Sequence, residues 1–488
     1  MLDNSFAQAL PMLGKTWMPH AAAQPSWLVF NASLADQLGL DVAALAGEKG
    51  LSIFSGQALP EGSTPIAQAY AGHQFGGFSP QLGDGRALLL GELLTPHHQR
   101  CDIALKGSGK TPFARGGDGK AAVGPMLREY LISEAMHALG IPTTRTLAVV
   151  RTGESVQRER VLPGAVMCRI AASHLRVGTF EYVASHHNTH VLKTLVDYTL
   201  SRHDSNLRDA ENPVLALLEA AVDRQAELIA QWMGVGFIHG VMNTDNMTLP
   251  GETIDYGPCA FMEAHHPSTV FSSIDHHGRY AYGNQPNMAQ WNLARLGEAV
   301  LPLIANDMDQ ALELATRAIE AFRPIHARYW LKELQAKLGL TECADAVTDL
   351  NLAQDYLRLL QAHQIDHTLG FRYLSSVLRG DSSALTSLFR EGAPDLSTWL
   401  AAWQQRLTME RRPIETIAHA MDQKNPYVIP RNHRVEEALS LASEHNDLSQ
   451  FHALLEAVTH PYEAPQGGLD VSPAPKGFTS RYQTFCGT

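Results

Sequence analysis

One stretch of the chain, residues 239–257, places carboxylates and amides at a spacing that suits phosphate chemistry. It reads HGVMNTDNMTLPGETIDYG. Short apolar runs on either side of the Pro-Gly turn at 250–251 predict a tight hairpin. The hairpin would bring Asn246 and Asp255, which stand at its two ends, close together. A carboxylate and an amide oxygen at one point suit Mg²⁺ or Mn²⁺, which would also hold phosphates.

The spacing in this stretch resembles the catalytic loop and metal motif of protein kinases, H-R-D-x-x-x-x-N followed by D-F-G. His239 and Asn246 match the His and the Asn, and Asp255 with the Tyr-Gly that follows it matches D-F-G. Val241 stands where a kinase has the Asp that serves as its base, and a valine cannot accept a proton. Asp245 is the acid nearest to that role. The alternative is a loop whose acids and turn occur by chance, and the full spacing argues against it.

A site of this kind also needs a lysine at a strand end and a helix glutamate that holds the lysine. Lys106 closes the apolar strand predicted at 103–105, and Glu129 lies on the next helix, predicted over 125–139. Apolar residues at every fourth position and a following Gly-x-Pro predict that helix and its end. Glu134 is the competing partner on the same helix. Taken alone, Lys106 would read equally well as a solvated strand end.

Two short glycine-rich elements could bring backbone N–H groups close to phosphate oxygens. They are Gly83-Asp84-Gly85-Arg86 and Gly117-Asp118-Gly119. The arginine of the first element would add bidentate charge. Each element is weak evidence alone, because Gly-Asp-Gly is also ordinary turn chemistry.

Two arginines, Arg169 and Arg176, stand seven residues apart in CRIAASHLRVGTFE. On a helix, seven residues make nearly two turns, so we expect both side chains to point the same way. Such a pair could clamp a polyphosphate. The alternative is a solvated basic face.

Composition excludes several classes of protein. The 488 residues carry 38 Lys and Arg against 50 Asp and Glu, a net charge of −12, which argues against a non-specific nucleic-acid binder. No apolar run approaches the roughly 18 residues of a membrane span, and the first residues do not resemble a signal peptide. The five cysteines are too few for a disulfide framework. We therefore expect a cytoplasmic protein that binds neither nucleic acid nor membrane.

The order of predicted elements favours an α+β fold with two lobes. Strands are predicted at 87–90, 103–105, 146–150 and 165–170, in a Gly-rich first part that holds one sharp helix. A second helix is predicted over 214–233, with Gly234 as its C-cap, and residues 290–460 read as mostly helical. Strands gathered before helices indicate α+β rather than a doubly wound sheet. We expect a β-rich nucleotide-binding lobe with an N-terminal extension over 1–180, a helical catalytic lobe over 181–460, and an extended tail over 461–488 that ends near a cysteine.

Six long segments of the chain carry a resemblance to a known family. They are YAGHQFGGFSPQLGDGRALLLGE, LKGSGKTPFARGGDGKA, LREYLISEAMHALGIPTTR, MCRIAASHLRVGTFE, HGVMNTDNMTLPGETIDYGP and RYQTFCGT. These segments resemble the selenoprotein O family, whose members are protein nucleotidyltransferases (AMPylators) built on a kinase-like, two-lobed fold with family-specific extensions. The resemblance covers nearly the whole chain.

The resemblance implies an activity and roles for the site residues. The activity is metal-dependent transfer of AMP from ATP to Ser, Thr or Tyr hydroxyls of proteins, with UTP as a possible second nucleotide. Asp245 corresponds to the catalytic base, and Asn246 and Asp255 correspond to ligands of Mg²⁺ or Mn²⁺. The nucleotide-binding positions that it implies are Gly83, Gly85, Arg86, Lys106, Asp118, Gly119, Arg169, Arg176 and Asp255, with Glu129 in support.

The family binds its nucleotide flipped relative to ordinary kinases, which agrees with Val241 in the place of the kinase base. Two alternatives stay open. One is a small-molecule phosphotransferase, against which Val241 argues. The other is a nucleotide-binding pseudokinase scaffold, against which the retained acids at 245 and 255 argue. The family's C-terminal Cys or selenocysteine matches Cys486. The resemblance implies a partner cysteine further along the loop after Asp255, but that stretch, STVFSSIDHHGRY, has none, and Cys259 is the only thiol near Asp255. The sequence therefore does not favour a regulatory disulfide.

Overall fold

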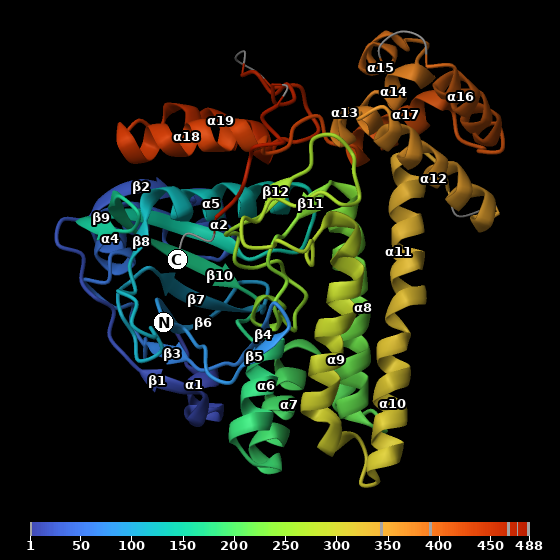
Figure 1. Cartoon of the computed structure of the whole chain (residues 1–488). Helices are drawn as coiled ribbons and strands as arrows, with labels where there is room; N and C mark the ends of the chain where they lie inside the picture. Colours follow the sequence, from blue (N-terminus) through green and yellow to red (C-terminus); the bar gives the residue numbers. More distant parts are fainter. Residues whose placement is uncertain (1, 342–344, 390–392, 466–468, 476, 486–488) are drawn as a thin grey trace.

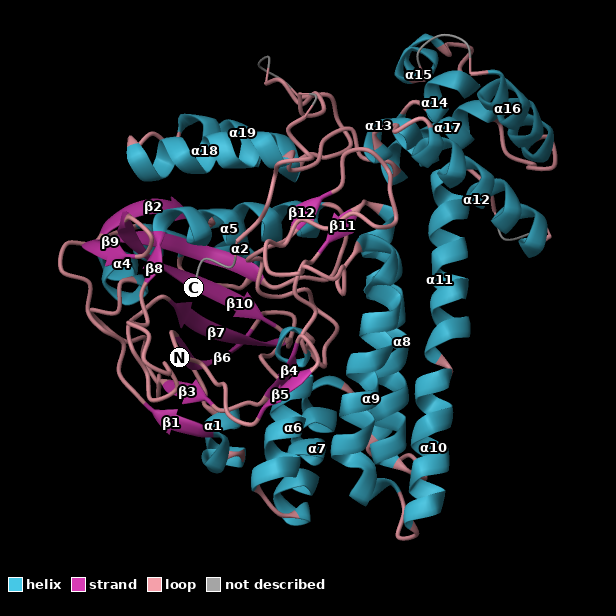
Figure 2. Ribbon diagram, viewed as in Figure 1, coloured by secondary structure: helices cyan, strands magenta, loops and turns pink. Residues whose placement is uncertain are grey.

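The computed structural model describes residues 2–341, 345–389, 393–465, 469–475 and 477–485. It is an α+β structure in which a large sheet lies at one side and long helices stand at the other (Figures 1 and 2). The α+β fold class predicted from the order of elements is therefore confirmed. Four short helices before residue 55 were not predicted. They are α1 (Ser5–Ala9), α2 (Ala32–Gln37), α3 (Val42–Ala46) and α4 (Glu48–Phe54).

Eight strands of the described chain form one sheet, and every pairing in it is antiparallel. The order is β1-β3-β6-β7-β10-β9-β2, and β8 pairs with one end of β10. The four strands predicted from apolar runs lie inside β6, β7, β9 and β10, the long strands of the sheet. The strands are β1 (Gly14–Thr16), β2 (Ser26–Phe30), β3 (Ile66–Gln68), β6 (Ala87–Leu94), β7 (Arg100–Lys106), β8 (Ala121–Ala122), β9 (Arg145–Gln157) and β10 (Val161–Ala171).

The predicted first helix is α5 (Val123–Ala138), which ends at the C-cap Leu139. It packs against β9 and β10 on one side and against α18 (Asn432–Glu444) and α19 (Ser449–Thr459) on the other, so that it is covered from both sides (Figure 1). A helix covered on all sides is apolar around most of its circumference. The charged side chains of α5 that are buried therefore need partners inside the protein.

Long helices form the second part of the chain, as the sequence predicts. Among them, α8, α9, α10 and α11 pack side by side and stand upright in Figure 2. These helices are α6 (Val177–His186), α7 (Thr189–His203), α8 (Pro213–Gly234), α9 (Gln285–Ile304), α10 (Met308–Glu320) and α11 (Phe322–Lys337). The predicted C-cap is wrong, because Gly234 is still helical and the left-handed residue is Gly236, with φ of 74°.

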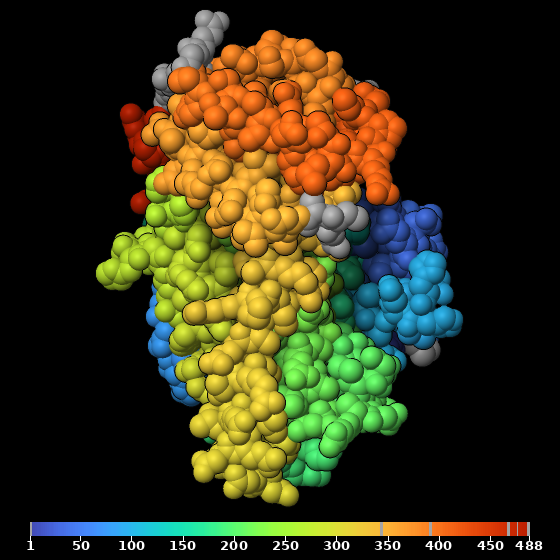
Figure 3. All heavy atoms as spheres, turned by 90° about the vertical axis from the view of Figure 1, so that its right-hand side faces the viewer, coloured from blue at the N-terminus to red at the C-terminus, as the bar shows by residue number. Residues whose placement is uncertain are grey.

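Six further helices build a hydrophobic core of their own at the C-terminal end of α11. Trp403, Tyr356 and Phe371 are among its fully buried residues. Figure 3 shows this part as the orange mass above the yellow surface of α10 and α11. The helices are α12 (Ala346–Ala362), α13 (His367–Arg372), α14 (Leu374–Leu378), α15 (Ser383–Leu388), α16 (Pro394–Leu407) and α17 (Ile414–Lys424).

The predicted hairpin over 247–254 does not form. A turn is present at Pro250–Gly251, but Thr248 pairs with Arg176 and Thr253 pairs with Thr143 instead of with each other. The arms are too short to make a ladder of their own, so each arm takes its backbone partner from another segment. The two ends of the stretch still reach the same cavity.

The prediction that Arg169 and Arg176 share a helix face is also wrong. Arg169 lies within β10, where it stands between β7 and β9, and Arg176 is the residue before α6. The apolar run before Ala171 forms a strand that is paired on both sides. This pairing, and not the seven-residue spacing of the two arginines, decides the local structure.

The tail takes an irregular path over its described residues. Its described residues form no helix or strand, and Thr484 makes a bridge with Ser272. The tail therefore returns from α19 to the loop that follows Asp255. None of the described helices is both long and apolar enough to cross a membrane.

Candidate active site

A cavity of about 1310 Å³ lies between the sheet, the start of α5, the loop around Asp245 and the tail. Every residue that the sequence analysis proposed for the site lines this cavity. They are Gly83, Gly85, Arg86, Lys106, Asp118, Gly119, Glu129, Arg169, Arg176, Asp245, Asn246 and Asp255. The residues come from segments far apart in the chain, which the fold brings to one place.

Asp255 is bound by three cations. The Oδ1 atom of Asp255 lies 2.6 Å from Lys106 Nζ and 2.6 Å from Arg169 Nη2. Its Oδ2 accepts from Arg176 Nη1 at 2.8 Å. Burial would raise the pKa of Asp255, but these three cations hold it well below its usual range. The carboxylate therefore stays charged, and 22 % of the side chain remains exposed toward the cavity.

Glu129 of α5 is the second carboxylate of this cluster. Its Oε2 accepts from Lys106 at 2.7 Å, and its Oε1 accepts from Arg169. The competing residue, Glu134, pairs instead with Arg145, whose Nε and Nη2 both lie 2.6 Å from it. The sequence could not decide which of the two glutamates pairs with Lys106. The structure decides it, because the two side chains point in different directions from α5.

The inner cluster joins three cations to several carboxylates. Lys106, Arg169 and Arg176 form ion pairs with Glu129 and Asp255, and both arginines are almost fully buried. Arg176 also interacts electrostatically with the buried carboxyls of Asp84 and Asp245. Buried cations are retained where charged partners satisfy them. The forked guanidinium groups at the cavity wall suit phosphate oxygens.

Arg176 also connects Asp255 to the loop that carries Asp245. The same Nη1 donates to the main-chain carbonyl of Asp245 at 2.6 Å, and the guanidinium lies 4.8 Å from the centre of the Tyr70 ring. Asp245 lies in a 3₁₀ turn, Thr244–Asn246, and is buried. Burial raises the pKa of Asp245 to about 6, although Arg176 partly opposes this effect. A carboxyl with this pKa is ionised at neutral pH and can accept a proton.

His239 holds the loop against the strand that leads to Asp255. Its Nε2 lies 2.9 Å from the Ile254 carbonyl, to which it donates. Val241 is buried in the turn, and its carbonyl accepts from the side-chain amide of Asn246 at 2.9 Å. The amide nitrogen of Asn246 is thus occupied, so its oxygen is the atom that it can offer to a cation.

Two glycines at the mouth of the cavity are required by close packing. A Cβ at Gly83, which has φ of 88°, would lie 2.6 Å from the Phe113 ring. A Cβ at Gly119, with φ of 69°, would lie 2.2 Å from the backbone of Gly109. Asp118 is engaged by Arg158, which donates at 2.9 Å. Each glycine-rich loop therefore packs closely against the segment 109–113, where a side chain would not fit.

The donor set suits a cation that is shared with a bound phosphate. No group of three or more His, Cys, Asp and Glu side chains in the described part of the chain is arranged to hold a metal ion. Asn246 and Asp255 offer oxygen atoms only, as Mg²⁺ and Mn²⁺ prefer. One carboxylate and one amide leave most of an octahedral shell to phosphate oxygens and water.

Sequence reasoning missed several residues at this cavity. Arg128, next to Glu129, donates to the Cys259 carbonyl at 2.7 Å and to Glu436 at 2.9 Å. The sequence did hold a signal for Arg128, because Arg128 and Glu129 are adjacent charged residues on a largely apolar helix. Gln74 had none, because its contact with Asp245 joins segments far apart in the chain. Cys259 is buried and is a free cysteine, and the disulfide with Cys486, which the sequence does not favour, would involve a residue outside the described ranges.

The fold thus brings carboxylates, buried cations and glycine-rich loops together at one cavity. The chain belongs to the SelO family, because the family model described as Protein adenylyltransferase SelO matches residues 2–459. Among its relatives, a protein nucleotidyltransferase YdiU of Chromobacterium violaceum is 56 % identical over 96 % of this chain and 98 % of its own length. Proteins of the same name from Rhizobium johnstonii and Mycolicibacterium paratuberculosis are each 53 % identical over 100 % of this chain, and over 97 % and 98 % of their own lengths.

Proposed function

We propose that this protein transfers AMP from ATP to Ser, Thr or Tyr hydroxyls of other proteins, with UTP as a second nucleotide to be tested. The family description and the names of the relatives support adenylyl transfer. We further propose that the fold is the two-lobed, kinase-like fold, with the sheet and α5 in one lobe and helices α6 to α17 in the other, while α18 and α19 return to pack against α5.

The observation that carries the proposal is the contrast between Val241 and Asp255. Val241 is buried and cannot serve as a base, whereas Asp255 is surrounded by the cations that a triphosphate needs. The site lacks the base of a kinase but keeps the cations that bind phosphate. This combination fits a flipped nucleotide, which presents the α-phosphorus to the acceptor.

The residues of the chain then act mainly by positioning and by charge. Lys106, Arg169 and Arg176 bind the phosphate oxygens and stabilise the charge that develops as pyrophosphate leaves. Glu129 holds the first two of these in place. Asp245 accepts the proton of the acceptor hydroxyl, since its raised pKa is close to the working pH. The bond from the acceptor oxygen to the α-phosphorus forms as the bond to pyrophosphate breaks.

The family suggests a divalent metal requirement, and we propose that Asn246 and Asp255 hold Mg²⁺ or Mn²⁺. When bound, the cation would offset the charge of the triphosphate. Its affinity without nucleotide is expected to be weak, because the protein supplies only two ligands.

Mass spectrometry of an acceptor tests the proposal. An unstructured synthetic polypeptide that contains Ser, Thr and Tyr is incubated with the protein, ATP and Mg²⁺, and then repeated with Mn²⁺ and with UTP. The proposal predicts an added AMP on a hydroxyl, and competition between ATP and UTP gives the preferred nucleotide. An added phosphate would instead favour a phosphotransferase, and no modification would favour a nucleotide-binding scaffold.

A further inference from the structure

A small hairpin that the proposed mechanism does not use lies against the loop of Asp245. It consists of β4 (Gly72–Gln74) and β5 (Gly77–Ser79). The backbone N–H of His73 donates to Thr244 Oγ1 at 2.7 Å, and the N–H of Phe75 donates to Asn243 Oδ1 at 3.1 Å. The hairpin is thus bonded to the two residues that precede Asp245.

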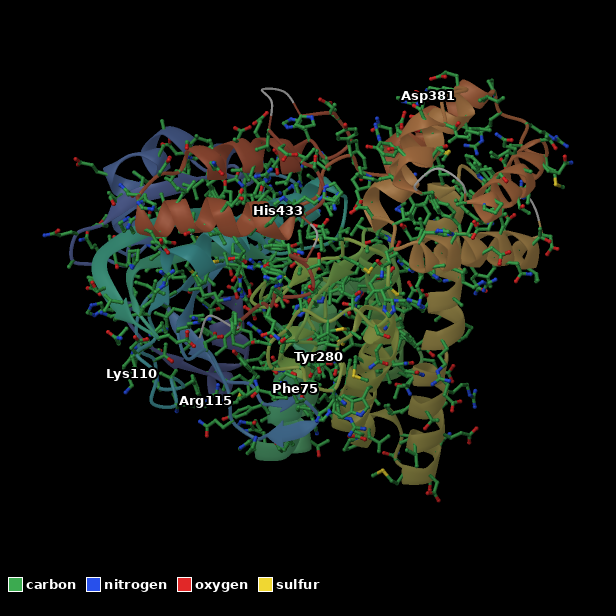
Figure 4. The ribbon with its side chains drawn as sticks, turned by 45° about the horizontal axis from the view of Figure 1, so that its top comes forward. Phe75, Lys110, Arg115, Tyr280, Asp381 and His433 are labelled. Atoms are coloured by element: carbon green, nitrogen blue, oxygen red, sulfur yellow. The ribbon has the colours of Figure 1, made fainter. Side chains whose placement is uncertain are left out.

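Further contacts fix the hairpin from both sides. Figure 4 shows Phe75 beside Tyr280, and their ring centres lie 5.1 Å apart. The hydroxyl of Tyr280 also donates to Asn243 Oδ1, at 2.6 Å. On the other side, Glu181 of α6 is hydrogen-bonded to both His73 and Thr244. The hairpin is therefore held rigidly against the 3₁₀ turn.

Gln74 is the hairpin side chain that reaches the Asp245 carboxylate. Its Nε2 donates to Asp245 Oδ2 at 3.3 Å, and both side chains line the cavity. The other oxygen, Oδ1, is buried and has no hydrogen-bond partner among the described residues. It packs against Gly72, where a Cβ would lie only 2.7 Å from it. The carboxylate is therefore held between a glycine on one side and a single amide donor on the other.

We propose that Gln74 is a positioning residue for nucleotidyl transfer, which fixes the Asp245 carboxylate so that Oδ2 meets the incoming hydroxyl. The inference rests on the proposed function, in which Asp245 accepts the proton. Oδ2 has room for two donors, so the amide of Gln74 and the acceptor hydroxyl can share it. A carboxylate free to rotate would spend less time in the reactive geometry, and small misplacements of catalytic groups are costly.

The experiment compares Gln74→Met with wild type in transfer of α-labelled AMP from Mg²⁺-ATP to the synthetic polypeptide. Methionine keeps the length of the side chain but removes the donor. We expect kcat to fall roughly tenfold to a hundredfold, the effect of one hydrogen bond to a charged group, while the Kd of ATP and Tm stay unchanged. Phe78→Leu is the matched control, because Phe78 is exposed on the same hairpin and does not line the cavity; we expect its kcat to stay within about twofold.

A rescue variant separates positioning from packing. Gln74→His restores an N–H donor without adding a fixed charge beside Asp245, so it should recover part of the rate that Gln74→Met loses. Gln74→Glu keeps the shape but replaces the donor with a second carboxylate, so it should be the slowest of the three.

Each outcome decides between two claims. Unchanged kcat in Gln74→Met, with active wild type, overturns the role of Gln74 and leaves the proposed function intact. A parallel loss of ATP affinity or of Tm assigns Gln74 a structural role and also overturns the inference. No transfer by wild type overturns the proposed function, and the role of Gln74 with it.

Discussion

Arg176 and Asp255, which are 79 residues apart in the chain, are joined by a hydrogen bond of 2.8 Å at the wall of the cavity. The same guanidinium nitrogen holds the backbone of Asp245. One arginine therefore sets the distance between the proposed base and the proposed metal ligand. A bound phosphate would compete with Asp255 for this guanidinium, so nucleotide binding and the geometry of the loop are coupled.

Removal of either buried arginine should reduce transfer strongly. Arg169→Ala or Arg176→Ala removes a charge-assisted contact to phosphate, worth roughly 1.5–3 kcal/mol, and should lower kcat/KM about tenfold to a hundredfold. Steady-state kinetics with labelled ATP measure the effect. Arg317→Ala is the control, since Arg317 pairs with Glu313 on the exposed surface of α10. If Arg169→Ala and Arg176→Ala both matched wild type, as the control should, the two buried arginines would have no part in phosphate binding.

Asp255→Asn tests the metal site with little change of shape. The variant keeps an oxygen but loses the negative charge that three cations now share. We expect transfer to be lost, and we expect Mg²⁺ to stop improving ATP affinity. Titration calorimetry with ATP, in the presence and absence of Mg²⁺, measures this difference. Transfer at the wild-type rate would show that Asp255 is not needed for the cation.

The pH dependence of transfer should report the ionisation of Asp245. Burial raises its pKa to about 6, so the carboxyl becomes protonated as the pH falls through that value and can no longer accept a proton. The rate should therefore fall on the acid side of pH 6 and level off above it. Asp245→Ala should lose about 10²–10⁴-fold in kcat while ATP still binds. A variant that kept the wild-type rate and pH profile would exclude Asp245 as the base.

The site residues could be predicted from sequence where local order fixes them. Lys106 ends an apolar strand and the next helix carries acidic side chains, so a glutamate partner on that helix could be expected, but only the structure selects Glu129 over Glu134. The partners of Arg169 could not be read in this way, because strand pairing with β7 and β9 decided against the helical spacing. Gln74 meets Asp245 across 171 residues, and no local pattern indicates such a contact. The lobe boundaries at 180 and 460 and the cytoplasmic location stay predictions.

A buried lysine far from the cavity gives a prediction about stability. Burial, aided by the nearby Lys424 and opposed by Glu333, lowers the pKa of Lys337 on α11 from 10.5 to about 7. Between these two pH values the unfolded chain binds a proton that the folded chain does not, so stability rises with pH from about 7 to about 10.5. Lys337→Met should remove this dependence and stabilise the fold at pH 7 by on the order of a few kcal/mol.

Urea unfolding of wild type and Lys337→Met at several pH values gives the free energy of unfolding of each protein. Contributions of other titrating groups are common to both proteins and cancel in the difference. The Phe371 ring, 4.3 Å from Lys337 Nζ, packs equally well against a methionine. If the variant were less stable than wild type at pH 7, or if its free energy of unfolding kept the wild-type dependence on pH, the Lys337 ammonium of the wild type would be charged and satisfied inside the fold.

The central claim is that AMP, and not the γ-phosphoryl group, is transferred from a flipped nucleotide. The most direct measurement uses two parallel reactions of wild type and Asp245→Ala, one with ATP labelled at the α-phosphate and one with ATP labelled at the γ-phosphate. Our account predicts protein-bound α-label with wild type, little α-label with Asp245→Ala, and γ-label only in released pyrophosphate. Protein-bound γ-label without α-label would contradict it, because the nucleotide would then lie as in an ordinary kinase.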